Sequence, residues 1–293
     1  MLVELHALIA AGRNQSSDAQ RLRVQMEVPE AHLSEKEIIR LNELSSDLSM
    51  THEREIPDQE VSARVSRDEL PLRIQTAIAN HDWEVVLQLL RAGVSHLWKP
   101  AQIAYVRSRA YESLGEFAPA IAFMDEAAKR APDNVNYSAL AIRLLWEGNR
   151  FEEAYSRARD CLRNQNSNSR LVLMSGGIIA RQSMQGILPF DFTAIAKVAV
   201  DRMTHALPIE KSPNLVFAGF VALGLLAVHL DNTTAATDAF DEALAVGTDE
   251  QITSNPTLNR ELELLRSGKS KTAEERANAR QLAEIFKPAL ALV

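Results

Sequence analysis

Residues 110–134 read AYESLGEFAPAIAFMDEAAKRAPDN, and the pattern of residue sizes in this stretch returns later in the chain. Phe117 and Ala120 are matched by Phe151 and Ala154, in both cases 34 positions further on. A fixed interval of this length is typical of helical hairpins stacked one after another, because each repeat is one helix–turn–helix unit. The sequence therefore predicts an all-α repeat fold.

Each residue of this pattern has a physical role in a hairpin. Gly115 supplies the backbone freedom that a tight turn between antiparallel helices needs. Ala120 and Ala127 lie seven positions apart, hence on one helix face, where small side chains let the neighbouring helix approach closely. Pro132 stops the second helix because it has no N–H to continue the hydrogen-bond ladder. We predict one hairpin with its turn at Gly115.

The stretch 110–134 resembles the tetratricopeptide repeat (TPR) family, on the residues just described. The resemblance implies a right-handed superhelical solenoid of TPR-like helical hairpins with terminal capping helices. It also implies a binding scaffold, in which the first helix of each hairpin lines a concave groove. The partner would be a protein, and the oligomeric state is left open.

The repeat register predicts three parts of the chain: N-terminal helices and a polar linker over 1–66, about five TPR-like repeats over 67–250, and C-terminal capping helices over 251–293. The predicted repeats are 67–97, 101–132, 135–166, 169–208 with an insertion at 183–192, and 213–246. Trp83 keeps the register of Phe117 in the first repeat. In the last repeat Asp231-Asn232 replaces the turn glycine, which asparagine can do at this kind of position.

The two ends of the chain carry helix start signals. Ser34 and Glu37 form a predicted capping box, and we expect the helix that follows to cap the first repeat. A second box at Thr272 and Glu275 opens the predicted C-terminal helix. Residues 12–30 show no clear period and are predicted to be a flexible connector.

Composition limits the classes of function. The net charge of −7 argues against generic nucleic-acid binding. The single cysteine, Cys161, excludes an internal disulfide framework, fits a reducing compartment, and leads us to expect a cytoplasmic protein with a small buried thiol. The apolar run 215–230 has 16 residues. A membrane span needs about 20, so we predict a buried helix instead.

The sequence contains no phosphate-binding glycine loop, no zinc-protease motif and no nucleophile elbow. We therefore expect no cofactor, no metal and no enzymatic activity. His52 beside Glu53 and Glu55 is the nearest approach to a metal cluster, and it is a weak one. Two alternatives stay open: an accessory or regulatory subunit of an enzyme such as a glycosyltransferase, and an enzyme with an unrecognised site.

The resemblance implies that one position of each first helix faces the concave groove. In this sequence Arg109 and Arg143 hold it, 34 positions apart. The predicted partner-binding residues are Tyr105, Arg109, Arg143, Trp146, Arg170 and Arg181. Arginine and aromatic side chains together favour an acidic peptide segment as the ligand. The alternative is that these arginines only pair with nearby acids such as Glu112 and Glu147.

The insertion at 183–192 has two interpretations. Leu188, Phe190 and Phe192 are costly to expose, so the segment is either a partner-contacting projection or a loop that packs against its own chain. The burial of the two phenylalanines decides between these interpretations.

Overall fold

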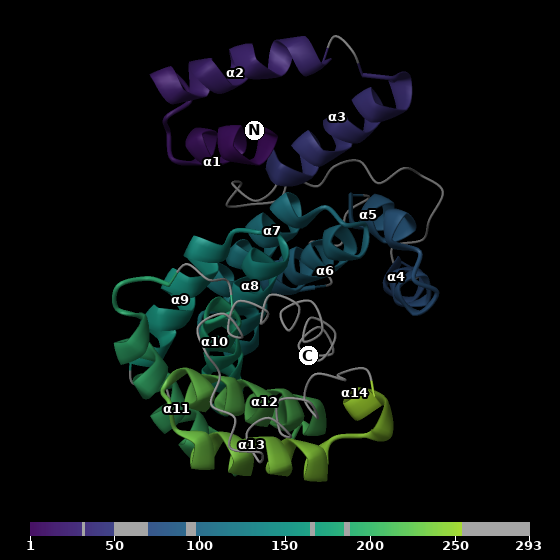
Figure 1. The fold of residues 1–293 in the computed structure, drawn as a ribbon. Helices are drawn as coiled ribbons and strands as arrows, with labels where there is room; N and C mark the ends of the chain where they lie inside the picture. The colour runs from purple at the N-terminus through teal and green to yellow at the C-terminus, as the bar shows by residue number, and fades with distance from the viewer. Residues whose placement is uncertain (31–32, 50–69, 92–97, 165–167, 185–187, 254–293) are drawn as a thin grey trace. The chain divides into compact units, whose positions relative to one another are not determined.

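A computed structural model describes residues 1–30, 33–49, 70–91, 98–164, 168–184 and 188–253. Every helix or strand assigned within these ranges is an α-helix, as the sequence predicts (Figure 1). Their bounds are α1 Leu2–Ala10, α2 Ser17–Glu30, α3 Glu35–Ser49, α4 Leu70–Ala79, α5 Trp83–Arg91, α6 Pro100–Ser113, α7 Phe117–Arg130, α8 Val135–Glu147, α9 Phe151–Arg163, α10 Ser169–Gln182, α11 Phe192–Ala206, α12 Pro213–His229, α13 Thr233–Val246 and α14 Asp249–Thr253. The predicted C-terminal capping helices, the last of which opens at Thr272, lie outside the described residues.

The chain divides into two compact units, and the division falls inside α8. The first unit runs from Met1 to Tyr137, and the second begins at Ser138. In the first unit α6 packs along α7, and in the second α12 packs along α13 (Figure 1). The helical hairpin is therefore the building block of both units.

The turns between paired helices share one backbone geometry. In the repeats, four turn residues have positive φ angles: His81 at 57°, Gly115 at 77°, Asn149 at 60° and Asp231 at 57°; Gly12, between α1 and α2, has one of 70°. After each of them the next N–H reaches back five residues, as when Glu116 donates to the carbonyl of Tyr111 at 2.8 Å. The first three turn residues are spaced 34 apart, so the turns follow the register predicted from the sequence.

Small residues lie where the helices of a hairpin approach most closely. Ala120 and Ala154 are fully buried, as predicted. The hydroxyl of Ser108 on α6 donates to the carbonyl oxygen of Ala120 on α7 at 2.7 Å. On α12, a β-carbon added at Gly224 would overlap the buried ring of Phe240 on α13. Small residues at these positions of the sequence thus indicate where two helices pack closely.

The start of α3 has the predicted capping box. The Glu37 carboxylate accepts hydrogen bonds from the backbone N–H and the hydroxyl of Ser34, at 2.8 and 2.6 Å. In return, the N–H of Glu37 donates to the Ser34 hydroxyl at 3.4 Å. These bonds satisfy backbone donors that the first turn of a helix otherwise leaves without partners.

One prediction for the N-terminal part is wrong. Residues 17–30 were expected to belong to a flexible connector, but they form α2. Only Ala19 and Leu22 are buried among the side chains described on this helix, and two buried positions are too few to mark a helix in the sequence. Local polar contacts begin the helix instead: the Ser16 hydroxyl accepts the N–H of Ala19 at 3.3 Å, and Asp18 accepts from Arg13 at 3.1 Å.

The turn geometry gives a first test by mutation. Replacing Gly115 by alanine is expected to lower the free energy of unfolding by about 1 kcal/mol. No atom lies within 4 Å of the new β-carbon, so the cost comes from the φ angle of 77° alone. Gly115→Asn is the control, since Asn149 adopts the equivalent conformation at 60°. Chemical denaturation should show the smaller loss for asparagine; equal losses would contradict the backbone explanation.

Candidate binding site

Two of the predicted groove residues lie on α6 in the first unit. The ring of Tyr105 is tilted against the ring of Tyr137, with their centroids 5.4 Å apart. Arg109 donates from Nη1 to a carboxylate oxygen of Glu112 at 2.7 Å, and its side chain is 37% exposed. Arg109 is therefore a surface arginine with a local acidic partner. This agrees with the alternative that the predicted arginines only pair with nearby acids.

Arg143 on α8 holds the same repeat position as Arg109, but it is buried, with 4% of its surface exposed. Its Nη1 lies 3.1 Å from both carboxylate oxygens of Glu147, one helical turn further on. Because this ion pair is enclosed, removal of one partner would leave a charge with little access to water. The pair fixes two opposite charges side by side on α8.

Arg181 on α10 places a second guanidinium beside this pair. Its carbon Cζ lies 6.0 Å from the centre of the Trp146 ring, and Trp146 packs edge-on against Phe151. The residue is 4% exposed, and two of its nitrogens, Nε and Nη2, have no hydrogen-bond partner. We call Arg143, Trp146, Glu147 and Arg181 the arginine cluster.

The positive charge of Arg181 is only partly compensated within the arginine cluster. Burial lowers the pKa of the Arg181 guanidinium to about 10. The negative charge of Glu147 opposes this decrease, and the positive charge of Arg143 adds to it. Glu147 is hydrogen-bonded to Arg143 and acts on Arg181 only through its charge, so Arg181 stays protonated at neutral pH with incomplete compensation of its charge.

Arg170 lies outside the arginine cluster. It is at the start of α10, three turns before Arg181, or about 16 Å along the helix. Its charge acts on Glu210 instead. Burial raises the pKa of the Glu210 carboxyl, but hydrogen bonds from Ser212 and Ser169, with a contribution from Arg170, lower that pKa overall.

The insertion between α10 and α11 combines a buried and an exposed phenylalanine. Phe192 is 1% exposed, whereas Phe190 is fully exposed and Leu188 is 37% exposed. Phe192 stacks on Tyr155 at 6.3 Å and meets His229 edge-on at 4.7 Å between ring centroids. Phe192 is a core residue, which corrects its assignment to a projecting loop. Leu188 and Phe190 remain on the surface.

Asp191 anchors the exposed Phe190 to the second unit. Its carboxylate accepts hydrogen bonds from the hydroxyl of Tyr155 and from Nη2 of Arg163, both at 3.0 Å. Arg159 lies 3.8 Å from the same carboxylate. Phe190 is thus an exposed phenyl ring next to a residue that the fold anchors.

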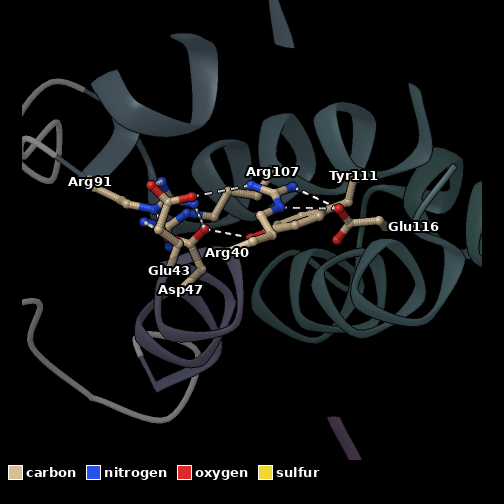
Figure 2. A network of polar contacts seen from close by, with 7 residues as sticks. All are labelled: Arg40, Glu43, Asp47, Arg91, Arg107, Tyr111 and Glu116. Atoms are coloured by element: carbon tan, nitrogen blue, oxygen red, sulfur yellow. Dashed lines mark hydrogen bonds and ion pairs between the residues drawn. The ribbon is translucent and has the colours of Figure 1, made fainter. Parts of the chain in front are cut away.

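The sequence did not reveal a buried polar network in the first unit, which Figure 2 shows from close by. Asp47 on α3 is fully buried. Its carboxylate accepts from Nε and Nη2 of Arg91 on α5, at 2.9 and 2.7 Å. It also accepts from the hydroxyl of Tyr111 on α6 at 2.6 Å, and Arg107 lies 3.9 Å away. Asp47 thereby joins α3 to two helices of the repeats.

The outer part of this network is more exposed. Arg40 on α3 donates from Nε and Nη2 to Glu116 at 3.1 and 2.9 Å, and Glu43 lies between Arg40 and Arg91 (Figure 2). No local motif marks these residues, because the partners of Asp47 stand 44 and 64 positions away in the sequence.

The remaining candidate chemistry is limited. Within the part of the chain that the structure describes, no three His, Cys, Asp or Glu side chains are placed to hold a metal ion. The weak cluster at His52, Glu53 and Glu55 lies outside the described residues. Burial raises the pKa of the Cys161 thiol, which disfavours the reactive thiolate. None of the described helices, α12 included, is long and apolar enough to cross a membrane.

The repeated hairpins and their shared turns define an all-α fold of TPR-like helical repeats. Neither a protein-family model nor a curated protein matches the chain. Among solved structures, it is similar to MamA from Desulfovibrio magneticus RS-1, with 16% identity over 61% of this chain and 94% of that one and a TM-score of 0.46. It is also similar to the apo form of the quorum sensor NprR from B. thuringiensis, with 16% identity over 94% and 82% of the two chains and a TM-score of 0.48. Structural similarity at 16% sequence identity does not identify a ligand for this chain.

Proposed function

We propose that the chain is a non-catalytic protein-interaction scaffold that binds an acidic segment of a partner protein. The observation that carries this proposal is the arginine cluster, where Glu147 is hydrogen-bonded to Arg143 and acts on the nearby Arg181 only through its charge. Such local positive charge in a chain of net charge −7 attracts acidic groups selectively. The partner-binding residues are those predicted: Tyr105, Arg109, Arg143, Trp146, Arg170 and Arg181.

The contacts of Arg109 are compatible with exchange of its partner. Its ion pair with Glu112 is partly exposed, and exposed pairs of this kind contribute only about 0–1 kcal/mol. An incoming carboxylate can therefore replace Glu112 at little cost. The tilted pair of Tyr105 and Tyr137 on the same unit offers apolar contact to the rest of a bound segment.

Leu188 and Phe190 are proposed as a second contact with a partner. Phe190 is fully exposed next to the anchored Asp191, so a partner with an apolar pocket could bind the ring without reordering the loop. This contact is separate from the arginine residues. Phe190→Ala would test it, with loss of binding expected for a partner that uses the loop.

The proposal is tested with pools of labelled peptides, one rich in Asp and Glu and one rich in Lys and Arg. We expect the chain to bind the acidic pool, and the double variant Arg109→Ala/Arg143→Ala to weaken binding at least about tenfold, since hydrogen bonds to charged groups contribute about 1.5–3 kcal/mol. Fluorescence anisotropy at low and high salt measures the affinity. Salt should reduce binding, because the attraction is electrostatic.

The control removes the same charge from exposed positions. Arg21→Ala/Arg150→Ala deletes two arginines whose side chains are 67% and 45% exposed. This variant should bind as the wild type does. Equal binding by the Arg109/Arg143 variant, with its helical circular dichroism intact, would show that the groove assignment is wrong.

A further inference from the structure

The strongest unexplained feature of the second unit is the guanidinium of Arg181. It is 4% exposed, and its Nε and Nη2 make no hydrogen bond. Enclosed polar groups of proteins are nearly always hydrogen-bonded, and an enclosed charge without compensation costs free energy. Arg181 therefore has two nitrogen donors, Nε and Nη2, that make no hydrogen bond within the fold.

We propose that the arginine cluster is a subsite for a single carboxylate group, which Arg181 binds through its unused nitrogens. This inference rests on the proposed function only for the source of the carboxylate, a side chain or chain end of the partner. The planar fork of a guanidinium matches the two oxygens of a carboxylate, and the paired bonds fix the orientation of the ligand. The Arg181 guanidinium lies over the ring of Trp146, with Cζ 6.0 Å from the ring centre, so the ring adds a cation–π contact on one side of the subsite.

The charges of the cluster select a singly charged ligand. Among the named residues of the arginine cluster, Arg143 and Arg181 carry two positive charges and Glu147 one negative charge, which sum to one positive charge. A carboxylate neutralises this charge. A phosphate dianion would leave one uncompensated negative charge beside Glu147, which is costly away from water. Glu147 therefore acts as the specificity residue of the subsite, although it carries the same sign of charge as the ligand.

Access to the subsite requires a movement of Arg181. Its two unpartnered nitrogens are enclosed, so the side chain has to shift for a ligand to reach them. An enclosed charge without a partner is unfavourable in free energy, and this favours the movement once an anion is present to bind the guanidinium. Glu147 stays with Arg143, to which it is bonded through both oxygens. The ligand thus supplies the partner that Arg181 lacks.

The test uses the full chain and three probes: acetate, inorganic phosphate, and a capped peptide of glycines with one central glutamate. Ionic strength is kept constant with chloride. Two-dimensional NMR follows the Nε–Hε signal of Arg181, which is assigned by its loss in Arg181→Met. We expect acetate and the peptide to shift this signal, and phosphate to bind about tenfold more weakly at a pH of about 8, where it is mostly dianionic.

Two variants make the result specific. Arg181→Met should lose the binding of acetate and peptide at least about tenfold and should melt at a higher temperature than the wild type, because an enclosed unpaired charge has been removed. Glu147→Gln raises the local charge to two, so it should shift the preference from acetate towards phosphate. Arg150→Met, at a 45% exposed arginine, is the matched control and should change neither property.

The outcomes separate this inference from the proposed function. Acetate binding that depends on Arg181, together with no binding of acidic peptides, supports the subsite and contradicts the protein-binding function. Acidic peptides that bind equally well to Arg181→Met support the scaffold and overturn the subsite. A lower melting temperature of Arg181→Met would show that the guanidinium has a stabilising partner within the fold, and it would also overturn the inference. So would phosphate binding as tight as acetate binding to the wild type.

Discussion

Replacing Asp47 by alanine is expected to lower the free energy of unfolding of the first unit by about 3–5 kcal/mol. Asp47 is fully buried and accepts two hydrogen bonds from Arg91 and one from Tyr111 (Figure 2). Its removal leaves the half-buried Arg91 without this carboxylate, and the hydroxyl of the buried Tyr111 without its acceptor. The loss of stability therefore comes from buried polar groups that have lost their hydrogen-bond partner. This loss exceeds the net stabilisation that the hydrogen bonds provide in the intact protein.

The measurement should distinguish loss of the contact from general damage. Hydrogen exchange is expected to speed up in α3, which Asp47 joins to α5 and α6, and thermal unfolding should begin at a lower temperature. Glu153→Ala is the control, because Glu153 accepts two bonds from Arg150 at 2.7 and 2.6 Å on an exposed surface. This control should cost less than about 1 kcal/mol. Unchanged exchange in α3 would contradict the role given to Asp47.

The repeat register could be predicted from the sequence because its causes are local. A tight turn needs a residue that tolerates positive φ, and a close helix contact needs a small side chain. The residue types at Gly115 and Ala120 are therefore enough to predict the turn and the close helix contact. His81 shows the limit of this reasoning: it adopts a φ of 57° at the equivalent turn, although histidine is no obvious turn residue. Only the 34-residue interval from Gly115 points to its conformation.

The candidate site could be predicted only in part. Residue type and register placed Arg109 and Arg143 at one repeat position, but the side chain of the first is 37% exposed and that of the second 5%. Burial depends on the neighbouring helices, which differ from repeat to repeat. The lack of a partner for Arg181 likewise depends on distances between helices, and no spacing along the chain encodes it. The partners of Asp47 were missed for the same reason.

Replacing Ala120 by tryptophan is expected to destabilise the first unit by about 3 kcal/mol or more, at the upper end of the cost of overpacking a core. Ala120 is fully buried on α7, and its carbonyl oxygen accepts the hydroxyl of Ser108 on α6 at 2.7 Å. An indole at this position must push α6 and α7 apart and so break that bond. Chemical denaturation of the two proteins measures the difference.

Ala118→Trp is the matched control, since Ala118 lies two residues earlier on the same helix and is exposed. Its substitution adds the same side chain to the same helix but meets solvent, so the free energy of unfolding should change by less than about 0.5 kcal/mol. The contrast between the two positions isolates the close approach of α6 and α7 from the helix propensity of tryptophan. Equal stability of the two variants would mean that Ala120 does not face α6, and the 34-residue register that links it to Ala154 would then be wrong.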